Sequence, residues 1–156
     1  MATSVVFTLI PRLVTVFDSV LSNVNVTHGY MVSEDPGNFL LVGVDDPDSS
    51  DRSPASEGSQ KWAGLGANTS YEEGTVACCA LSWNGQGDLA AALASLAETT
   101  AAIESALRDD PNLGGQVPGL NWVKYGSRWR LEENQATDGA EALIFFELAF
   151  KARLAA

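Results

Sequence analysis

Apolar side chains recur at helical spacing in two stretches of the chain. The first stretch, Pro11 to Asn23, presents a face made of Leu13, Val16, Phe17, Val20 and Val24. Proline fits the first turn of a helix, where its missing N–H breaks no bond, so we expect this helix to begin at Pro11. The second stretch lies between Asp88, a favoured helix N-cap, and Pro111, and its repeating positions are Leu89, Leu93, Leu96, Thr100, Ile103 and Leu107.

Two short extended stretches follow the first helical pattern. Asn25 to Val32 and Asn38 to Val44 are separated by Ser33 to Gly37, which ends in Pro-Gly. Proline and glycine supply turn geometry, so the pattern predicts a hairpin-like pair of strands.

Three longer strands are expected further along the chain. Thr75 to Trp83 is apolar on both faces, which is typical of a central strand. Leu120 to Leu131 and Glu141 to Leu154 alternate apolar and polar residues. The polar stretch Glu132 to Ala140 between them predicts a loop that joins an antiparallel pair.

A long acidic loop is expected from Asp45 to Gly58. Ala55 is the only apolar residue of this segment, which also holds two prolines and five acidic residues, so it cannot bury enough surface to fold alone. The whole pattern predicts an α+β fold, with a mixed, mostly antiparallel sheet of about four to six strands packed against two helices. No repeat or linker divides the chain, and we expect one domain over residues 1–156.

Charge is the most unusual bulk property of the chain. The 20 acidic and 9 basic residues give a net charge of −11 at pH 7. Such a surface repels nucleic-acid phosphates, so tight DNA binding is not expected. The apolar N-terminal stretch is interrupted by Pro11 and Arg12 and is too short to span a bilayer. We therefore expect synthesis in the cytoplasm and no contact with a membrane.

Motifs for catalysis, cofactors or metals are weak. Gly85 to Ala90 imitates a dinucleotide-binding turn, but Asp88 would repel a pyrophosphate there, which favours a turn and helix cap. His28 is the only histidine, and Cys78 and Cys79 have no second cysteine pair or histidine nearby. Adjacent cysteines in a strand point to opposite faces, so we expect two free thiols. We expect no enzyme activity, cofactor or metal site.

Aromatic and basic residues towards the C-terminus predict an interaction surface. Five of the nine basic residues lie between Lys124 and Arg153, and aromatic residues and arginine are enriched in protein interfaces. The acidic loop has complementary charge, so we expect it to contact this patch in a neighbouring subunit, with simple surface charge as the alternative. The candidate interface residues are Asp45, Asp46, Asp48, Asp51, Glu57, Trp62, Tyr71, Trp122, Lys124, Arg128, Trp129, Arg130 and Lys151.

The amino-acid sequences of five segments, and their order along the chain, resemble those of the tail terminator proteins of long-tailed, siphovirus-type phages that infect actinobacteria. The segments span nearly the whole chain; they are PRLVTVFDSVL, EDPGNFLLVGVDDPD, KWAGLGANTSYEEGTVACCALSWNG, IESALRDDPNLGG and FFELAFKARL.

This resemblance implies a structural virion protein that forms a hexameric ring at the head-proximal end of the tail tube. Such a ring stops polymerisation of the major tail protein and joins the tail to the head connector or stopper protein. DNA meets the ring only in passage through its channel. The alternatives are another phage neck protein, such as a head-completion, connector or stopper protein, and, from other classes, a small ligand-binding domain, an enzyme, or a toxin-neutralising or other host cytosolic binding protein.

Overall fold

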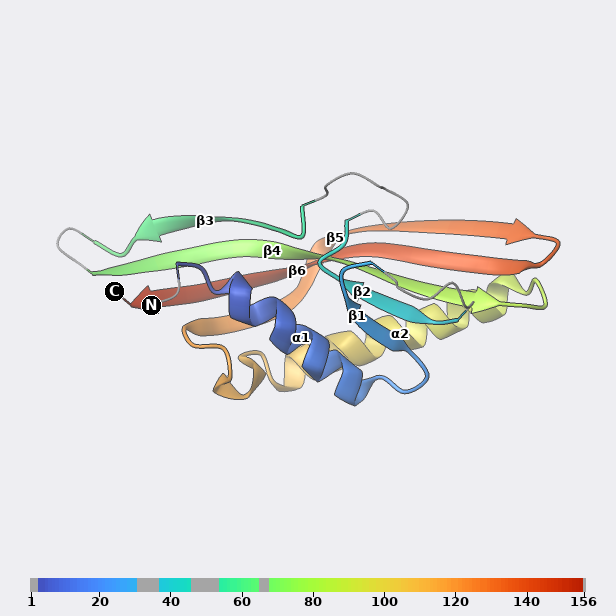
Figure 1. Ribbon diagram of the computed structural model, residues 1–156, viewed down its shortest axis with the longest axis horizontal. Coiled ribbons are helices and arrows are strands. Elements are labelled where there is room, and N and C mark those ends of the chain that lie inside the picture. Colours follow the sequence, from blue (N-terminus) through green and yellow to red (C-terminus); the bar gives the residue numbers. More distant parts are fainter. Residues whose placement is uncertain (1–2, 31–36, 46–53, 65–67, 156) are drawn as a thin grey trace.

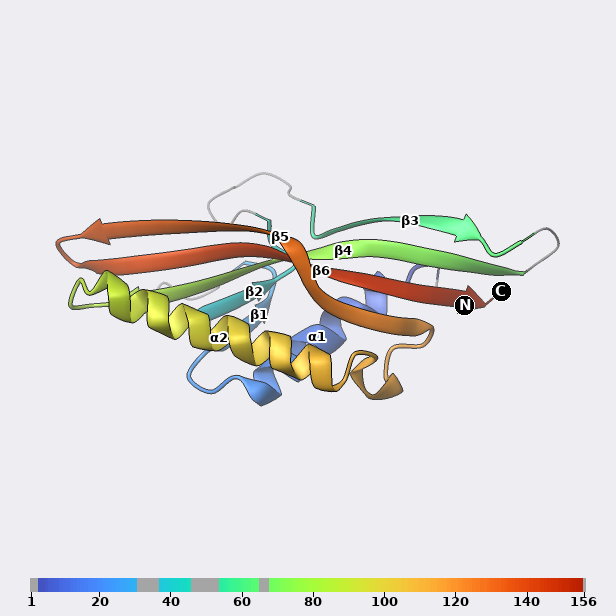
Figure 2. The ribbon, with the colours of Figure 1, turned by 180° about the vertical axis from the view of Figure 1, so that it is seen from behind.

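The computed structural model describes residues 3–30, 37–45, 54–64 and 68–155. The elements in chain order are α1 (Val6–Val20), β1 (Asn25–His28), β2 (Phe39–Val42), β3 (Ser56–Trp62), β4 (Thr69–Asn84), α2 (Leu89–Asp109), the short 3-10 helix η1 (Leu113–Gly115), β5 (Leu120–Ala136) and β6 (Gly139–Ala155). The strands form one six-stranded, mostly antiparallel sheet, and both α-helices lie on the same face of it (Figure 1). The predicted α+β fold is confirmed, and Figure 2 shows the same two layers from behind.

Strand β4 lies at the centre of the sheet, as its two apolar faces predicted. The strand order is β1-β2-β4-β6-β5, and β3 pairs with a second part of β4. Strand β6 pairs with β4 from Thr69 opposite Ala155 to Asn84 opposite Ala140. Directly opposite residues point to the same side of a sheet, so each row of this ladder faces either the helices or the other side. We call the side without helices the outer face.

Apolar clusters lie on both faces of the sheet. The larger one packs α1 and α2 against residues such as Val76, Phe146 and Phe150 of β4 and β6. The smaller one lies on the outer face and contains Phe39, Leu41, Val44, Cys79, Leu143 and Phe145. Cys78 belongs to the larger cluster and Cys79 to the smaller one; both are buried, and neither forms a disulfide. The alternation of side chains along β4 thus separates the two cysteines, as predicted.

Helix α2 agrees with its sequence pattern, whereas α1 begins earlier than Pro11 predicted. Helix α1 already includes Leu9 and Ile10, which are buried, and Pro11 lies inside it. A proline removes the bond to the carbonyl four residues earlier, here that of Phe7. Phe7 and Pro11 both lie on the exposed side of the helix, where water can bind that carbonyl. Val20, which was expected to face the core, is 46% exposed.

The predicted hairpin between residues 25–32 and 38–44 is wrong. Strands β1 and β2 run parallel, with Asn25 opposite Phe39 and His28 opposite Val42. Strand β2 is buried at all four positions because it lies between β1 and β4. Strand β1 ends at His28. The next residue, Gly29, has a φ of +85°, a backbone conformation that glycine adopts without strain. Residues 31–36, with the expected Pro-Gly turn, lie outside the described residues.

Two predicted loops are shorter than expected. The segment 45–58 runs into β3, which begins at Ser56, and its residues 46–53 lie outside the described residues. The segment 132–140 is mostly strand, and only Thr137 and Asp138 separate β5 from β6. Almost every residue of β3 and of the second half of β5 is exposed. Polar residues on both faces remove the apolar alternation by which a strand is recognised from sequence.

Candidate interaction surface

The strand register gathers aromatic and basic residues at one end of the outer face. We call this group the basic patch; it consists of Lys61, Tyr71, Trp122, Lys124, Lys151 and Arg153. Tyr71 lies between Lys61 of β3 and Arg153 of β6 in one row of the sheet. In the next row Lys151 lies opposite Trp122 of β5. The patch therefore combines residues of four strands, β3 and β4 from the middle of the chain and β5 and β6 from its C-terminal part.

Contacts within the patch orient its cations. Lys151 Nζ lies 3.0 Å from Glu73 Oε1 and 5.7 Å from the centroid of the Tyr71 ring. Lys124 Nζ lies 4.6 Å from the ring centroid of Trp122. An exposed ion pair or cation–π contact contributes up to about 1 kcal/mol. The side chain of Lys151 remains 38% exposed, and the other three cations are exposed.

Four predicted interface residues, Tyr71, Trp122, Lys124 and Lys151, thus lie together. Lys61 and Arg153 belong to the same patch but were not among the candidates. Arg153 follows Lys151 by two residues and therefore shares its face, which is a signal that the sequence contains. Lys61 could be placed only after β3 was known to pair with β4.

Arg128, Trp129 and Arg130 lie further along β5, away from the patch and beyond a register shift between Tyr125 and Trp129. Trp129 lies opposite Phe146, on the helix side, and is 66% exposed. Arg130 points to the outer face, where its guanidinium carbon lies 4.3 Å from the Phe145 ring centroid. Its Nε also lies 3.2 Å from Glu132 Oε1.

The two acidic candidates that the structure describes, Asp45 and Glu57, do not share one loop. Asp45 lines a hollow of about 190 Å³ together with Arg128 and Arg130 of the same chain. Glu57 lies in β3 and not in a loop, opposite Thr75 on the outer face. Asp46, Asp48 and Asp51 lie outside the described residues.

Trp62 does not lie in the basic patch. It pairs with Ser70, which lies opposite Leu154 on the helix side of the sheet. The indole is 77% exposed. Its role as an interface residue stays a prediction, and the sequence alone could not assign its face.

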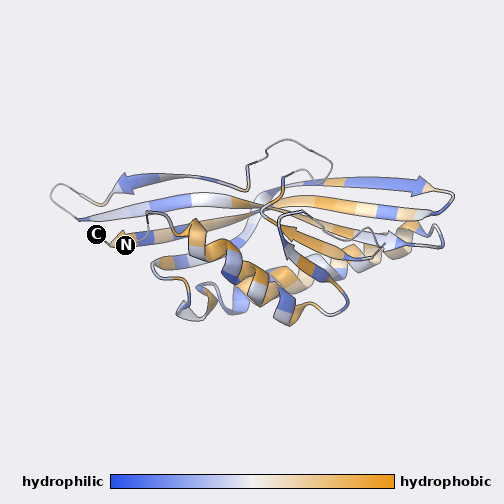
Figure 3. Ribbon diagram, in the orientation of Figure 1, coloured by the Kyte–Doolittle hydropathy of each residue, from blue (hydrophilic) through white to orange (hydrophobic). Residues whose placement is uncertain are grey.

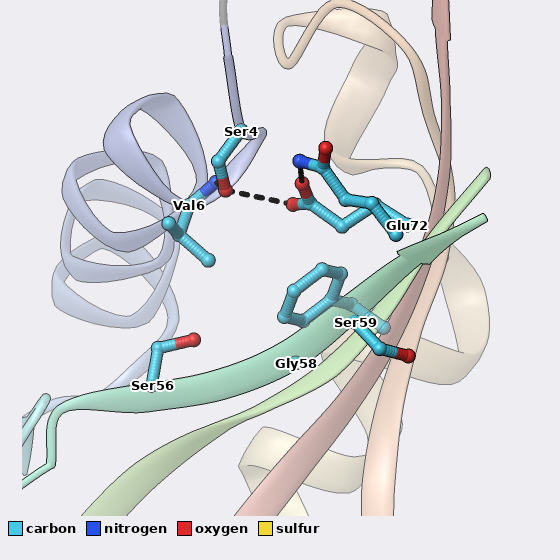
Figure 4. A pocket seen from close by; sticks show the side chains of 8 residues that line it. Ser4, Val6, Ser56, Gly58, Ser59 and Glu72 are labelled. Atoms are coloured by element: carbon cyan, nitrogen blue, oxygen red, sulfur yellow. Dashed lines mark hydrogen bonds between the residues drawn. The ribbon is translucent and has the colours of Figure 1, made fainter. Parts of the chain in front are cut away.

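A buried carboxylate, Glu72, lies in a hollow of about 300 Å³ between α1 and β3 (Figure 4). Its Oε1 accepts hydrogen bonds from Ser4 Oγ at 2.8 Å and from the Val5 backbone N–H at 3.0 Å. Its other oxygen accepts one from Gln60 Nε2. Both oxygens are thus occupied, and the negative charge lies at the N-terminus of a helix, where it is favourable. This arrangement indicates an anchor that joins α1 to β3 and β4.

The other chemically interesting residues are held in unreactive settings. Burial raises the pKa of the Cys78 thiol to about 12, and desolvation raises the pKa of Tyr125 to about 12. The Asp88 carboxylate accepts from the Ala91 N–H, so Gly85 to Ala90 forms a turn and a helix cap. His28 is exposed at the end of the edge strand β1. The described residues contain no group of three or more His, Cys, Asp or Glu side chains that could hold a metal ion.

The helices that the structure describes are not long and apolar enough to cross a membrane. No protein-family model matches the chain, and no curated protein matches it either.

Proposed function

We propose that the chain is a structural virion protein that assembles into a closed ring of copies, six in number, at the head-proximal end of a phage tail tube. There the ring stops tube polymerisation, joins the tail to the head connector or stopper protein, and leaves a channel for DNA. The resemblance of five segments to tail terminator proteins supports the identity and the number of copies.

The structural observation that best supports self-assembly is the exposure of large apolar side chains at two separate places on the helix side of the sheet. Trp62 of β3 is 77% exposed, and Trp129 and Leu131 of β5 are 66% and 41% exposed. Protein interfaces are enriched in such aromatic residues. A subunit with two separate apolar surfaces can form a heterologous contact, in which one surface of a copy binds the other surface of the next copy. Such contacts close into a ring when the rotation between copies divides a full turn.

The test is to locate the protein in the virion of the phage that encodes it and to delete its gene. Gold-labelled antibodies should mark the junction between head and tail, and particles without the protein should have tails of irregular length that do not join heads. Label along the tube, at the distal tip or absent from virions would contradict the proposal. Label at the junction with normal tail length in the deletion would instead identify another neck protein.

A further inference from the structure

We propose that the basic patch of one copy binds the tip of the β5–β6 hairpin of a second copy, so that subunits join head to tail. The exposed carboxylates of this hairpin form what we call the acidic tip: Glu132, Glu133 and Asp138. The contact deepens the ring proposed above and rests on it for closure, but the pairing of two copies can be measured without the virion.

The charge of the chain favours a second copy as the partner. The patch holds four cations, and the carboxylates of Glu57 and Glu73 lie beside them, so the net charge of this region is +2. Because the net charge of the whole chain is −11, the residues outside this region carry a net charge of −13. The segment from Leu131 to Phe150 contains five acidic residues and no basic one. Oppositely charged surfaces steer association and set its register. Beyond Arg130, which pairs with Glu132, the hairpin therefore presents only carboxylates as charged groups as far as Phe150.

The two surfaces cannot meet within one subunit. Glu132 lies opposite Leu143, whereas Trp122 lies opposite Lys151. These two positions on β6 are eight residues apart, or about 26 Å along an extended strand. Figures 1 and 2 show that the β5–β6 turn and the β3 end of the sheet lie at opposite ends of the molecule. A contact between them therefore requires a neighbour.

The end of the β5–β6 hairpin is exposed and has a free strand edge, so it can bind a neighbouring subunit. Every residue from Ser127 to Asp138 is exposed. In Figure 3 the second half of β5, next to the β5–β6 turn, is mostly hydrophilic. One edge of β5 pairs with no strand that the structure describes, so its backbone groups are available to a neighbour. On the patch, Tyr71 and Trp122 supply aromatic area beneath the cations, which is typical of the centre of an interface.

Single-stranded nucleic acid is the rival occupant, because aromatic and basic residues on a sheet also bind bases and phosphates. Two features disfavour it. Glu57 and Glu73 lie among the cations, and the chain as a whole carries −11, which repels a phosphate backbone.

The experiment reverses each surface separately and then both together. One variant carries Glu132→Lys and Glu133→Lys, a second carries Lys61→Glu and Lys124→Glu, and a third carries all four changes. Native mass spectrometry at low salt should show oligomers of the wild type that fall by about tenfold or more in each of the first two variants. The third variant, and an equal mixture of the first two, should recover them, because opposite charges face each other again.

A matched control carries Glu98→Lys and Asp109→Lys, two exposed positions of α2, and should assemble like the wild type. Its net charge changes as much as that of the first variant. Melting temperatures should show that all variants are folded.

Rings that persist in both single-surface variants would overturn this contact while the proposed ring itself would stand. A wild type that stays monomeric at all concentrations would overturn the contact, and the virion labelling above then decides the function separately. A DNA oligonucleotide that binds the wild type but not the Lys61→Glu, Lys124→Glu variant, with oligomers unchanged, would assign the patch to nucleic acid.

Discussion

The backbone N–H of Val5 donates a hydrogen bond of 3.0 Å to Oε1 of Glu72, a residue 67 positions later in the chain. This bond fixes the first turn of α1 to the central strand β4, near the start of that strand. It also explains why a carboxylate that is only 3% exposed is present in a protein for which we propose no catalysis.

Replacing Glu72 with glutamine should destabilise the fold. The amide keeps one acceptor oxygen for the donors Ser4 and Val5, so its NH₂ group would face the donor Gln60 Nε2 and leave that hydrogen bond unmade. We expect a loss of about 1–3 kcal/mol of unfolding free energy, measured by urea denaturation. Glu73→Gln is the matched control, because Glu73 is exposed and has only the surface partner Lys151, and it should cost less than about 1 kcal/mol. Equal effects of the two variants would refute the anchor role of Glu72.

Gly74 allows β3, β4 and β6 to approach closely. A Cβ at this position would lie 2.9 Å from Gly58 Cα and from Phe150 Cζ, closer than real contacts permit. We expect Gly74→Ala to cost about 1–3 kcal/mol through overpacking, measured by thermal or urea unfolding. Gly64→Ala, where a Cβ meets nothing within 4 Å, should be close to neutral. A neutral Gly74→Ala would show that β3 can shift freely.

Cys78 should make the fold sensitive to alkali. Burial raises the pKa of the Cys78 thiol from 9.0 to about 12. The protonated thiol therefore contributes fully to stability below pH 9, and this contribution is lost as the pH rises towards 12. Between them the unfolded chain loses a proton that the folded chain keeps, and unfolding free energy falls by about 1.4 kcal/mol per pH unit. Cys78→Ala should lower this slope in urea titrations above pH 9. An unchanged slope would mean that the thiol ionises in the folded state without penalty.

Burial explains which elements could be predicted from the sequence. Helix α2 and the apolar half of β4 bury regular patterns, and Asp88 caps its helix as its position indicated. Strand β3 is held by pairing with β4 and buries almost nothing, so its sequence resembles a loop. The parallel pairing of β1 and β2 depends on a partner strand, β4, that lies far away in the chain.

The candidate interaction surface could likewise be predicted only in part, because its geometry depends on strand pairing. The register of β6 places Lys151 and Arg153 on one face, which alternation alone could predict. Trp122 and Trp129 are seven residues apart, so alternation alone already places them on opposite faces. The extra residues that β5 holds between Tyr125 and Trp129 change which residues of β6 lie opposite them, and such a bulge has no clear sequence signal. Charge complementarity within the chain was visible, but its geometry needed the sheet.

Salt should weaken assembly if the patch and the acidic tip hold the copies together. Exposed charges are screened over about 8 Å at physiological ionic strength and over about 3 Å at 1 M. Sedimentation velocity should therefore show the wild-type oligomers dissociating as sodium chloride rises, while the melting temperature changes little. Oligomers that strengthen with salt would instead indicate a mainly apolar contact through Trp62 and Trp129.

Cysteine cross-linking between Lys124→Cys and Glu132→Cys tests the head-to-tail contact most directly. The native thiols do not interfere, because Cys78 and Cys79 are buried. A chain carrying both new cysteines, treated with a short bis-maleimide, should give a ladder of covalent species that ends at the closed ring. A mixture of the two single-cysteine chains should give cross-linked dimers, and either chain alone should stay monomeric. A double-cysteine chain that forms no intermolecular product under conditions in which native mass spectrometry shows oligomers would contradict the account.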